Sequence, residues 1–209
     1  MQTKAVITHI SNWLKAYINS CNSKSFVIGV SGGIDSAVTS VLAAKTRLPL
    51  ICIEMPIHQN KLEAQRGSKH IKWLKKNFQN VSSLEMDLTS IFDEFIIKIP
   101  KKNKNELALA NTRSRLRMTT LYYLAQANNS LVLGTGNKVE DFGIGFFTKY
   151  GDGGVDISPI ADLLKSEVYN IAKELAISPE IISAPPTDGL WADNKTDEEQ
   201  IGANYTELE

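Results

Sequence analysis

The sequence predicts an α/β fold in which an open parallel sheet carries helices on both of its faces. Short apolar segments with β-branched residues recur along the chain, at 26–30, 49–55, 81–86 and 130–135. Helical patterns separate them, at about 36–46, 60–78 and 106–128. The first apolar segment also ends in a glycine-rich turn that leads into a helix. Alternating strands and helices joined by right-handed crossovers build a parallel sheet, so we expect a Rossmann-like arrangement.

The remaining segments complete a single domain over residues 1–209. Apolar residues at helical spacing predict an amphipathic helix over 3–20 and another helix over 163–176. The basic stretch 98–105 predicts a mobile loop, and 184–200 contains turn and charge signals. A helical pattern then reaches Glu209, so we expect that helix to continue beyond it.

Composition limits the partners of the protein. The chain has 209 residues, of which 43% are hydrophobic and 22% charged, and its 23 basic and 23 acidic side chains cancel. No global field therefore favours nucleic acid or an anionic membrane, and phosphate binding must be local. Cys21 and Cys52 lie far apart in or beside apolar segments, which is typical of free thiols in a reducing compartment. With neither a signal peptide nor an apolar run of about 18 residues, we expect a soluble cytoplasmic protein.

The glycine-rich turn GVSGGIDSAV has the features of a phosphate-binding loop. Gly32 and Gly33 let the backbone approach an anion closely, and the hydroxyls of Ser31 and Ser36 can donate to phosphate oxygens. The loop lacks the lysine of the G-x-x-x-x-G-K-[ST] motif. Asp35 would repel a phosphate unless a cation lay between them, so it is a candidate Mg²⁺ ligand. A plain Gly-Gly turn is the alternative for S-G-G alone, but the full SGGIDS context after a strand argues against it.

A second group of signals follows the segment at 130–135. Thr135 ends this apolar run and Glu140 comes five residues later, at the strand end where open α/β sheets place ligands. The string GFFTKYGDGGVD then supplies Lys149 and Asp156, and Lys165 lies further on. Taken singly, GDGG is a tight turn and the two phenylalanines are core residues. Their conjunction favours a site.

The glycine loop resembles the PP-loop of the N-type ATP pyrophosphatases, which cleave ATP between its α- and β-phosphates. The rest of the chain closely resembles one family among them, the short ammonia-dependent NAD synthetases. The matching strings are SGGIDS (31–36), RLRM (115–118), LVLGT (131–135) with Glu140, GFFTKYGDGGVD (145–156), Lys165 and PTDGL (186–190). The resemblance implies an adenine nucleotide alpha-hydrolase-like fold. The chain departs from the family pattern by one extra residue between Glu140 and Thr148, and by lacking a His-Lys pair near its C-terminus.

The resemblance also implies roles for individual residues. Mg²⁺ would bind Asp35 and Glu140, and the catalytic residues would be Asp35, Lys165 and Asp156, the last as a candidate base for ammonia. Arg115, Lys149 and Asp156 would bind deamido-NAD, with Tyr122, Tyr17 and Arg117 as weaker candidates. Tyr122 shares a helix face with Arg115, whereas Arg117 points elsewhere. For Tyr17, core packing is an equally good interpretation. The ATP contacts would come from Gly29, Val30, Ser31, Gly32, Gly33, Ile34, Asp35, Ser36, Thr135, Lys165 and Thr187.

The reaction implied by this resemblance is the last step of NAD biosynthesis. Deamido-NAD would be activated by ATP as an acyl-adenylate and then amidated by ammonia, giving NAD, AMP and pyrophosphate in a homodimer whose substrate lies near the subunit interface. A tRNA-thiolating enzyme is the nearest rival, but the neutral charge and isolated cysteines disfavour it. GMP synthetase is disfavoured because GFFTKYGDGG is foreign to it. A non-catalytic ATP-binding module is the alternative from another class.

Overall fold

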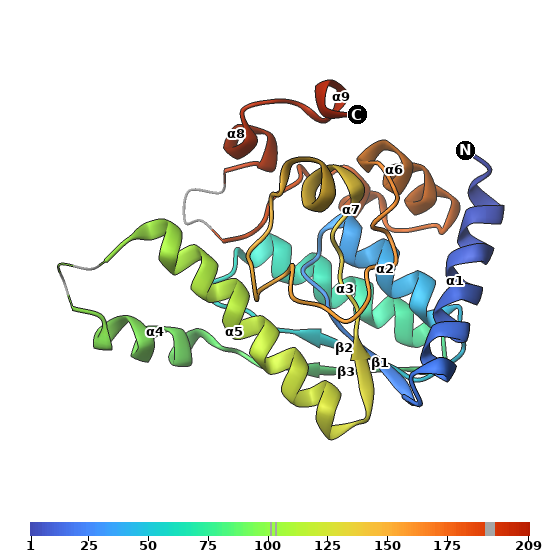
Figure 1. The fold of residues 1–209 in the computed structure, drawn as a ribbon, viewed down its shortest axis with the longest axis horizontal. Coiled ribbons are helices and arrows are strands. Elements are labelled where there is room, and N and C mark those ends of the chain that lie inside the picture. The colour runs from blue at the N-terminus through green and yellow to red at the C-terminus, as the bar shows by residue number, and fades with distance from the viewer. Residues whose placement is uncertain (101, 103, 191–194) are drawn as a thin grey trace.

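Four parallel strands form the sheet at the centre of the fold. The computed structural model describes residues 1–100, 102, 104–190 and 195–209. The strands are β1 (Ser25–Gly29), β2 (Leu50–Glu54), β3 (Val81–Glu85) and β4 (Ser130–Val132), and their order across the sheet is β3-β2-β1-β4 (Figure 1). Every pairing is parallel. The expectation of an open parallel sheet is confirmed.

The order of the strands creates a switch point between β1 and β4. The chain first moves outward through α2 (Ile34–Ala44) to β2 and through α3 (Lys61–Asn77) to β3. It then returns through α4 (Thr89–Lys98) and α5 (Glu106–Ala127) to β4, on the other side of β1. Open α/β sheets bind ligands outside the carboxyl ends of the strands where such a reversal occurs.

The helices cover both faces of the sheet, as the sequence predicts. One buried cluster joins the sheet to α1 (Thr3–Ser20), α2, α3, α6 (Lys165–Glu174) and α7 (Pro179–Ile182). A second joins the opposite face to α4 and α5. Strand side chains alternate between the two, so that Ile28 and Cys52 belong to the first cluster and Val27 and Ile53 to the second.

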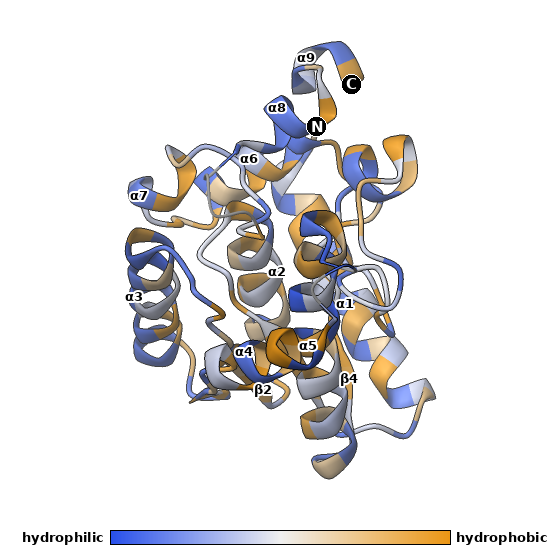
Figure 2. Ribbon diagram, turned by 90° about the vertical axis from the view of Figure 1, so that its left-hand side faces the viewer, coloured by the Kyte–Doolittle hydropathy of each residue, from blue (hydrophilic) through white to orange (hydrophobic). Residues whose placement is uncertain are grey.

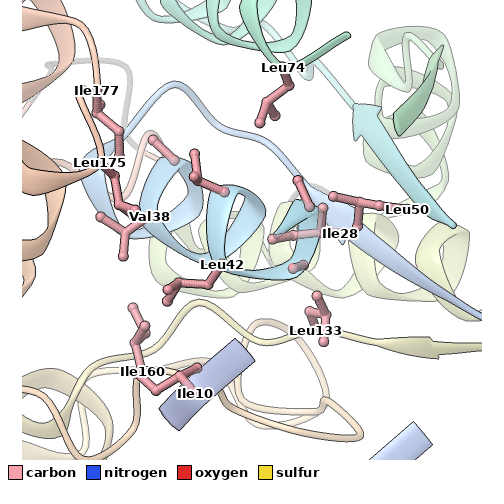
Figure 3. Close-up of a cluster of buried hydrophobic side chains, with 14 of the residues drawn as sticks. Ile10, Ile28, Val38, Leu42, Leu50, Leu74, Leu133, Ile160, Leu175 and Ile177 are labelled. Carbon is pink, nitrogen blue, oxygen red and sulfur yellow. The ribbon is translucent and has the colours of Figure 1, made fainter. Parts of the chain in front are cut away.

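The helix that follows the glycine loop is the most deeply buried of the helices. Val38 and Leu42 of α2 lie between the strand residues Ile28 and Leu50 and the side chain of Leu175 beyond α6 (Figure 3). Shortening a buried leucine such as Leu42 to alanine lowers the free energy of unfolding by about 2–5 kcal/mol. By contrast, the outer side of α3 is mostly hydrophilic (Figure 2). The core therefore fixes α2, and with it the loop at its N-terminus.

Several predicted boundaries differ from those observed. Helix α2 begins at Ile34, α6 spans Lys165–Glu174 instead of 163–176, and β4 ends at Val132. Helix α4, of which only Phe92 is buried, and the π-helix η2 (Lys138–Ile144) were not predicted. Short helices α7, α8 (Asp197–Ile201) and α9 (Tyr205–Leu208) occupy the C-terminal region.

Parts of two predicted loops lie outside the described residues. These parts are 101 and 103 in the predicted loop 98–105, and 191–194 in the turn-rich region 184–200. Across the described residues, no helix combines the length and the apolar character that a membrane span requires.

Candidate active site

The loop between β1 and α2 turns tightly because Gly32 has a conformation that other residues rarely adopt. Its φ is +88°, and a Cβ atom there would lie 2.5 Å from the carbonyl oxygen of Glu63 in α3. The hydroxyl oxygens of Ser31 and Ser36 lie 3.1 Å apart, and the Ser36 hydroxyl donates to the carbonyl of Gly33. Both hydroxyls and the N-terminal end of α2 thus meet at the carboxyl end of β1.

A buried lysine lies between the two carboxylates that the sequence suggests as metal ligands. The Nζ atom of Lys165 is 2.7 Å from Oδ2 of Asp35 and 2.8 Å from Oε1 of Glu140. Asp35 comes from the first turn of α2, Glu140 from η2 and Lys165 from the start of α6. The Lys165 side chain is 3% exposed. The structure therefore joins three sequence-predicted residues in one ionic cluster.

The charges of this cluster follow from burial and mutual attraction. Burial raises the pKa of Asp35, against the lowering effect of Lys165. Burial also acts to raise the pKa of Glu140, but the charge and hydrogen bond of Lys165 hold it below its ordinary value. For Lys165 the two carboxylates outweigh burial and keep its pKa well above the usual range. The lysine thus stays protonated, and the cluster carries an excess of negative charge when both carboxylates are ionised.

Two residues that the sequence did not single out hold the cluster in place. The fully buried side chain of Asn137 accepts hydrogen bonds from the backbone N–H groups of Val139 and Glu140 and donates to Oδ1 of Asp35 at 3.2 Å. The hydroxyl of Tyr205 in α9 donates to Oε1 of Glu140, and its ring centroid lies 5.0 Å from the Lys165 Nζ atom. Tyr205 has no local sequence signal for this role because its partners are distant in the chain.

A cavity of about 470 Å³ opens beside this cluster. Apolar side chains at the end of β2 and from α5 form much of its wall, including Ile53 of β2, Met55 just after it, and Met118 and Leu121 of α5. Three predicted ATP residues do not line this large cavity. Lys165 and Ile34 border a small adjoining cavity, whose lining also includes Asp35 and Thr187. Gly32 packs behind the loop against α3. The predicted ATP and metal residues that line the large cavity are Gly29, Val30, Ser31, Gly33, Asp35, Ser36, Thr135, Glu140 and Thr187.

Acidic groups dominate the charged part of this cavity. Among its described lining residues, Arg117 is the one cation, and burial lowers its pKa to about 10, which leaves it charged at neutral pH. Burial, reinforced by neighbouring carboxylates, raises the pKa of both Asp141 and Asp197 to about 7. The acidic lining residues are Asp35, Glu54, Glu85, Glu140, Asp141, Asp152, Asp188 and Asp197. A polyphosphate would enter this cavity only with compensating cations.

Arg117 lies in the cavity wall, whereas Arg115 is exposed on another side of α5. The Nε atom of Arg117 donates to the carbonyl of Met55 at 3.0 Å, and an Nη2 hydrogen bond of 2.8 Å reaches Oε1 of Gln59. Gln59 in turn donates to Glu63, which also accepts a hydrogen bond from the Thr187 hydroxyl at 2.7 Å. The weaker of the two arginine candidates is therefore the one built into the cavity.

The predicted deamido-NAD residues form contacts outside the cavity lining. Arg115 donates to the carbonyl of Lys149 at 3.0 Å. The Tyr122 hydroxyl donates to Oδ1 of Asp156 at 2.9 Å, and Oδ2 of Asp156 accepts a hydrogen bond from the backbone N–H of Val132. Four of the five residues thus form two pairs beside α5. Tyr17 lies on α1, where its ring contacts that of Trp13.

The carboxylates of Asp35 and Glu140 fit a divalent cation by their geometry. One oxygen of each carboxylate contacts the Lys165 ammonium, and a carboxylate has further lone pairs that a cation can use. Within the described part of the chain, no cluster of three or more His, Cys, Asp or Glu residues would hold a metal by itself. Mg²⁺ is commonly held by one or two carboxylates together with substrate phosphates and water. The donor set therefore fits a magnesium ion that arrives with a nucleotide.

A glycine loop at the switch point of a parallel sheet, beside a buried lysine–carboxylate cluster, defines a nucleotide-binding α/β protein with the PP-loop adenine nucleotide alpha-hydrolase fold. Comparison with known proteins makes this more specific. The model of the family described as NAD synthase matches residues 6–209. The chain belongs to the NAD synthase family.

Relatives support this membership over nearly the whole chain. An NH(3)-dependent NAD(+) synthetase of Mesoplasma florum is 38% identical, with coverage of 100% of this chain and 84% of the relative. One from Mycoplasmopsis pulmonis is 40% identical, with coverage of 97% and 76%.

Solved structures show the same similarity. An NMN synthetase from Francisella tularensis has a TM-score of 0.91 at 33% identity and covers 100% of this chain and 84% of its own. An NH3-dependent NAD synthetase from Campylobacter jejuni has a TM-score of 0.79 at 30% identity, with coverage of 87% and 77%.

Proposed function

We propose that this protein is an ammonia-dependent NAD synthetase, which amidates deamido-NAD at the expense of ATP and releases NAD, AMP and pyrophosphate. The observation that carries the proposal is the convergence of the glycine loop, Asp35 and Glu140 at the wall of one cavity, with the Lys165 ammonium in contact with both carboxylates. The relatives named as NH(3)-dependent NAD(+) synthetases support it over nearly the whole length of this chain.

The chemistry requires activation of a carboxylate, which is too poor an electrophile for ammonia. A nicotinate carboxylate oxygen attacks the α-phosphorus of ATP, the bond to the bridging oxygen breaks, and pyrophosphate leaves. Ammonia then attacks the acyl carbon of the adenylate, AMP departs and the nitrogen loses a proton. No side-chain nucleophile is needed, so the protein contributes positioning and charge stabilisation.

The loop and the lysine are suited to the departing pyrophosphate. The Ser31 and Ser36 hydroxyls and the backbone amides at the start of α2 can donate to its oxygens. The ammonium of Lys165 has three N–H donors, of which the two carboxylates take two. Its third donor can bind a phosphate oxygen. The positive charge that the loop itself lacks thus comes from α6.

Mg²⁺ is the cofactor that we assign to Asp35 and Glu140. When bound, it would neutralise negative charge on the phosphates. The acid-rich lining of the cavity supports this requirement, since a polyphosphate without a cation would meet mainly carboxylates. Asp35 and Glu140 are held for this purpose by Asn137 and Tyr205.

Asp156 is better suited to substrate binding than to proton abstraction. Each of its oxygens already accepts a hydrogen bond, from Tyr122 and from the backbone of Val132. Both carboxylate oxygens are therefore already engaged and oriented before any substrate binds. With Arg115 and Lys149, it would contact the deamido-NAD molecule where that substrate extends beyond the cavity. We propose that a homodimer completes this region, with Tyr17 as a further candidate contact.

Amidation of the mononucleotide is a second candidate function. The structural similarity to an NMN synthetase covers the whole chain at a TM-score of 0.91. The reacting nicotinate carboxylate would be the same, and the two substrates differ only in the additional adenylate half of the dinucleotide. Residues such as Arg115 and Lys149, outside the cavity lining, are the groups available to distinguish them.

Product analysis tests both candidates. The protein is incubated with ATP, Mg²⁺ and ammonium, and with either deamido-NAD or nicotinate mononucleotide, and the products are separated by chromatography. AMP together with NAD, and a higher kcat/KM for deamido-NAD, supports the main proposal. A higher kcat/KM for the mononucleotide replaces it with the second. ADP as the product contradicts the mechanism, and tight ATP binding without turnover indicates a non-catalytic module.

The substrate-binding assignment has its own test. Arg115→Ala is expected to raise the KM for deamido-NAD while the KM for ATP stays within about twofold, because Arg115 lies outside the cavity lining. Lys72→Ala, on the polar side of α3, is the control. A raised KM for ATP with an unchanged KM for deamido-NAD would show that the assignment is wrong.

A further inference from the structure

A glutamate at the carboxyl end of β2 has an environment suited to a ligand with hydrogen-bond donors. Glu54 is the last residue of β2, the strand next to the glycine loop, and its side chain lines the large cavity. It is half-buried and takes part in no ion pair among the described residues. An unpaired carboxylate in a partly apolar wall is costly unless donors satisfy it.

The carboxylate of Glu54 is fixed on one side only. In the described part of the chain, the side-chain hydrogen bond of Glu54 comes from the Ser68 hydroxyl of α3, which donates to Oε1 at 2.6 Å. The neighbouring residue across the sheet is Glu85, a second carboxylate that also lines the cavity. Like charges on paired strands repel, so Glu85 cannot satisfy Glu54. The remaining acceptor capacity of Glu54 is therefore available to a bound molecule.

The position of Glu54 relative to the phosphate loop indicates which molecule this is. Gly67 in α3 packs between them: a Cβ atom there would lie 3.6 Å from Oε1 of Glu54 and 3.5 Å from the backbone N of Gly32. A nucleotide whose phosphates occupy the loop would thus place its nucleoside beside Glu54. In dinucleotide-binding α/β folds, an acidic residue about 20 positions after the glycine loop accepts a hydrogen bond from a ribose hydroxyl.

We propose that Glu54 binds the adenosine part of ATP as a hydrogen-bond acceptor, oriented by Ser68. This inference rests on the proposed function, because it takes ATP as the nucleotide in the loop. Adenosine offers such donors at its 2′- and 3′-hydroxyls and at its 6-amino group. The proximity of Glu54 to the loop favours the ribose hydroxyls, and the three sources can be separated with nucleotide analogues.

The test compares the Glu54→Gln variant with the unaltered protein. Steady-state kinetics and calorimetric binding are measured with ATP, 2′-deoxy-ATP, 3′-deoxy-ATP and purine riboside triphosphate, which lacks the amino group. Glu54→Gln is expected to raise the KM and Kd for ATP about 10-fold or more, the effect of losing a hydrogen bond to a charged group. The KM for deamido-NAD should stay unchanged. Glu94→Gln, an exposed glutamate on α4, is the matched control.

The analogues identify which group of ATP donates to Glu54, because removing that group and changing Glu54 should have non-additive effects on binding. The analogue that lacks the bound donor should bind the unaltered protein more weakly, and Glu54→Gln should then cause little further loss. An equal loss for ATP and for all three analogues, or no loss for ATP, would overturn the inference. If the unaltered protein binds ATP but converts neither deamido-NAD nor nicotinate mononucleotide, the proposed function fails. The calorimetric comparison of ATP binding still tests the role of Glu54 in that case. Circular dichroism confirms that the variant is folded.

Discussion

Replacing Lys165 by methionine should destabilise the protein strongly, because two buried carboxylates would lose their shared counter-charge. Methionine keeps the approximate length of the side chain but removes the ammonium. Lys165 is 3% exposed, and its Nζ atom lies within 2.8 Å of oxygens of both Asp35 and Glu140. Breaking a buried ion pair by removing one partner costs about 3–5 kcal/mol. For a chain of this size, that loss lowers Tm by roughly 6–20 °C.

The control for this change is an exposed ion pair of similar length. Lys69 lies 2.8 Å from Glu180, but the two side chains are 64% and 58% exposed. Exposed pairs contribute only about 0–1 kcal/mol. Lys69→Met should therefore lower Tm by no more than roughly 4 °C. The comparison separates the effect of burial from that of the lysine-to-methionine change itself.

Thermal unfolding monitored by circular dichroism measures both variants, with and without Mg²⁺. Added Mg²⁺ should raise the Tm of Lys165→Met more than that of the unaltered protein, because the cation can take the position vacated between Asp35 and Glu140. Equal Tm losses for Lys165→Met and Lys69→Met would refute the reasoning about the buried cluster. A Tm for Lys165→Met that does not respond to Mg²⁺ would contradict the assignment of the two carboxylates as metal ligands.

Three further predictions follow from single positions. Gly32→Ala should lower the free energy of unfolding by about 1–3 kcal/mol or more and abolish tight ATP binding. The alanine would have a φ of +88° and a Cβ atom 2.5 Å from a backbone oxygen. Tyr205→Phe should lower the free energy of unfolding by about 1.5–3 kcal/mol, because it removes the hydroxyl that donates to Glu140 and keeps the ring. Burial lowers the pKa of His70 to about 4 from 6.5, so its neutral ring contributes stability above pH 6.5 that is lost as the pH falls toward 4. This loss is about 3 kcal/mol, and His70→Gln should flatten it.

Each of these variants has a control and an outcome that contradicts it. Gly202→Ala has a similar φ of +81° but open space around it, so it isolates the backbone strain from the clash. Equal losses for the two glycine variants would contradict the role of the contact with α3. Tyr150→Phe, at a residue that is 72% exposed, should leave urea unfolding unchanged, and equal losses for the two tyrosine variants would contradict the role of the Tyr205 contact with Glu140. If the unaltered protein and His70→Gln lose stability equally between pH 6.5 and 4, His70 is not the responsible group.

Local signals were sufficient for the sheet and for the loop. The alternation of apolar segments and helical patterns predicted the four parallel strands, and the glycine spacing placed the turn before α2. The predicted bounds of helices and strands were wrong where tertiary contacts determine them. Helix α4 buries only Phe92, and the π-helix around Glu140 depends on the Asn137 side chain that caps it. Neither feature produces a clear period in the sequence.

The sequence by itself determined which residue types are present, their order, and the family whose motifs they match. Only the tertiary structure decided which of them meet. Lys165 contacts Asp35 across 130 positions of chain, and Tyr205 reaches Glu140 across 65. Arg117 faces the cavity and Arg115 does not, although they are two residues apart on one helix. Such contacts are long-range because the carboxyl ends of parallel strands gather side chains from separate crossovers, and no local pattern encodes that convergence.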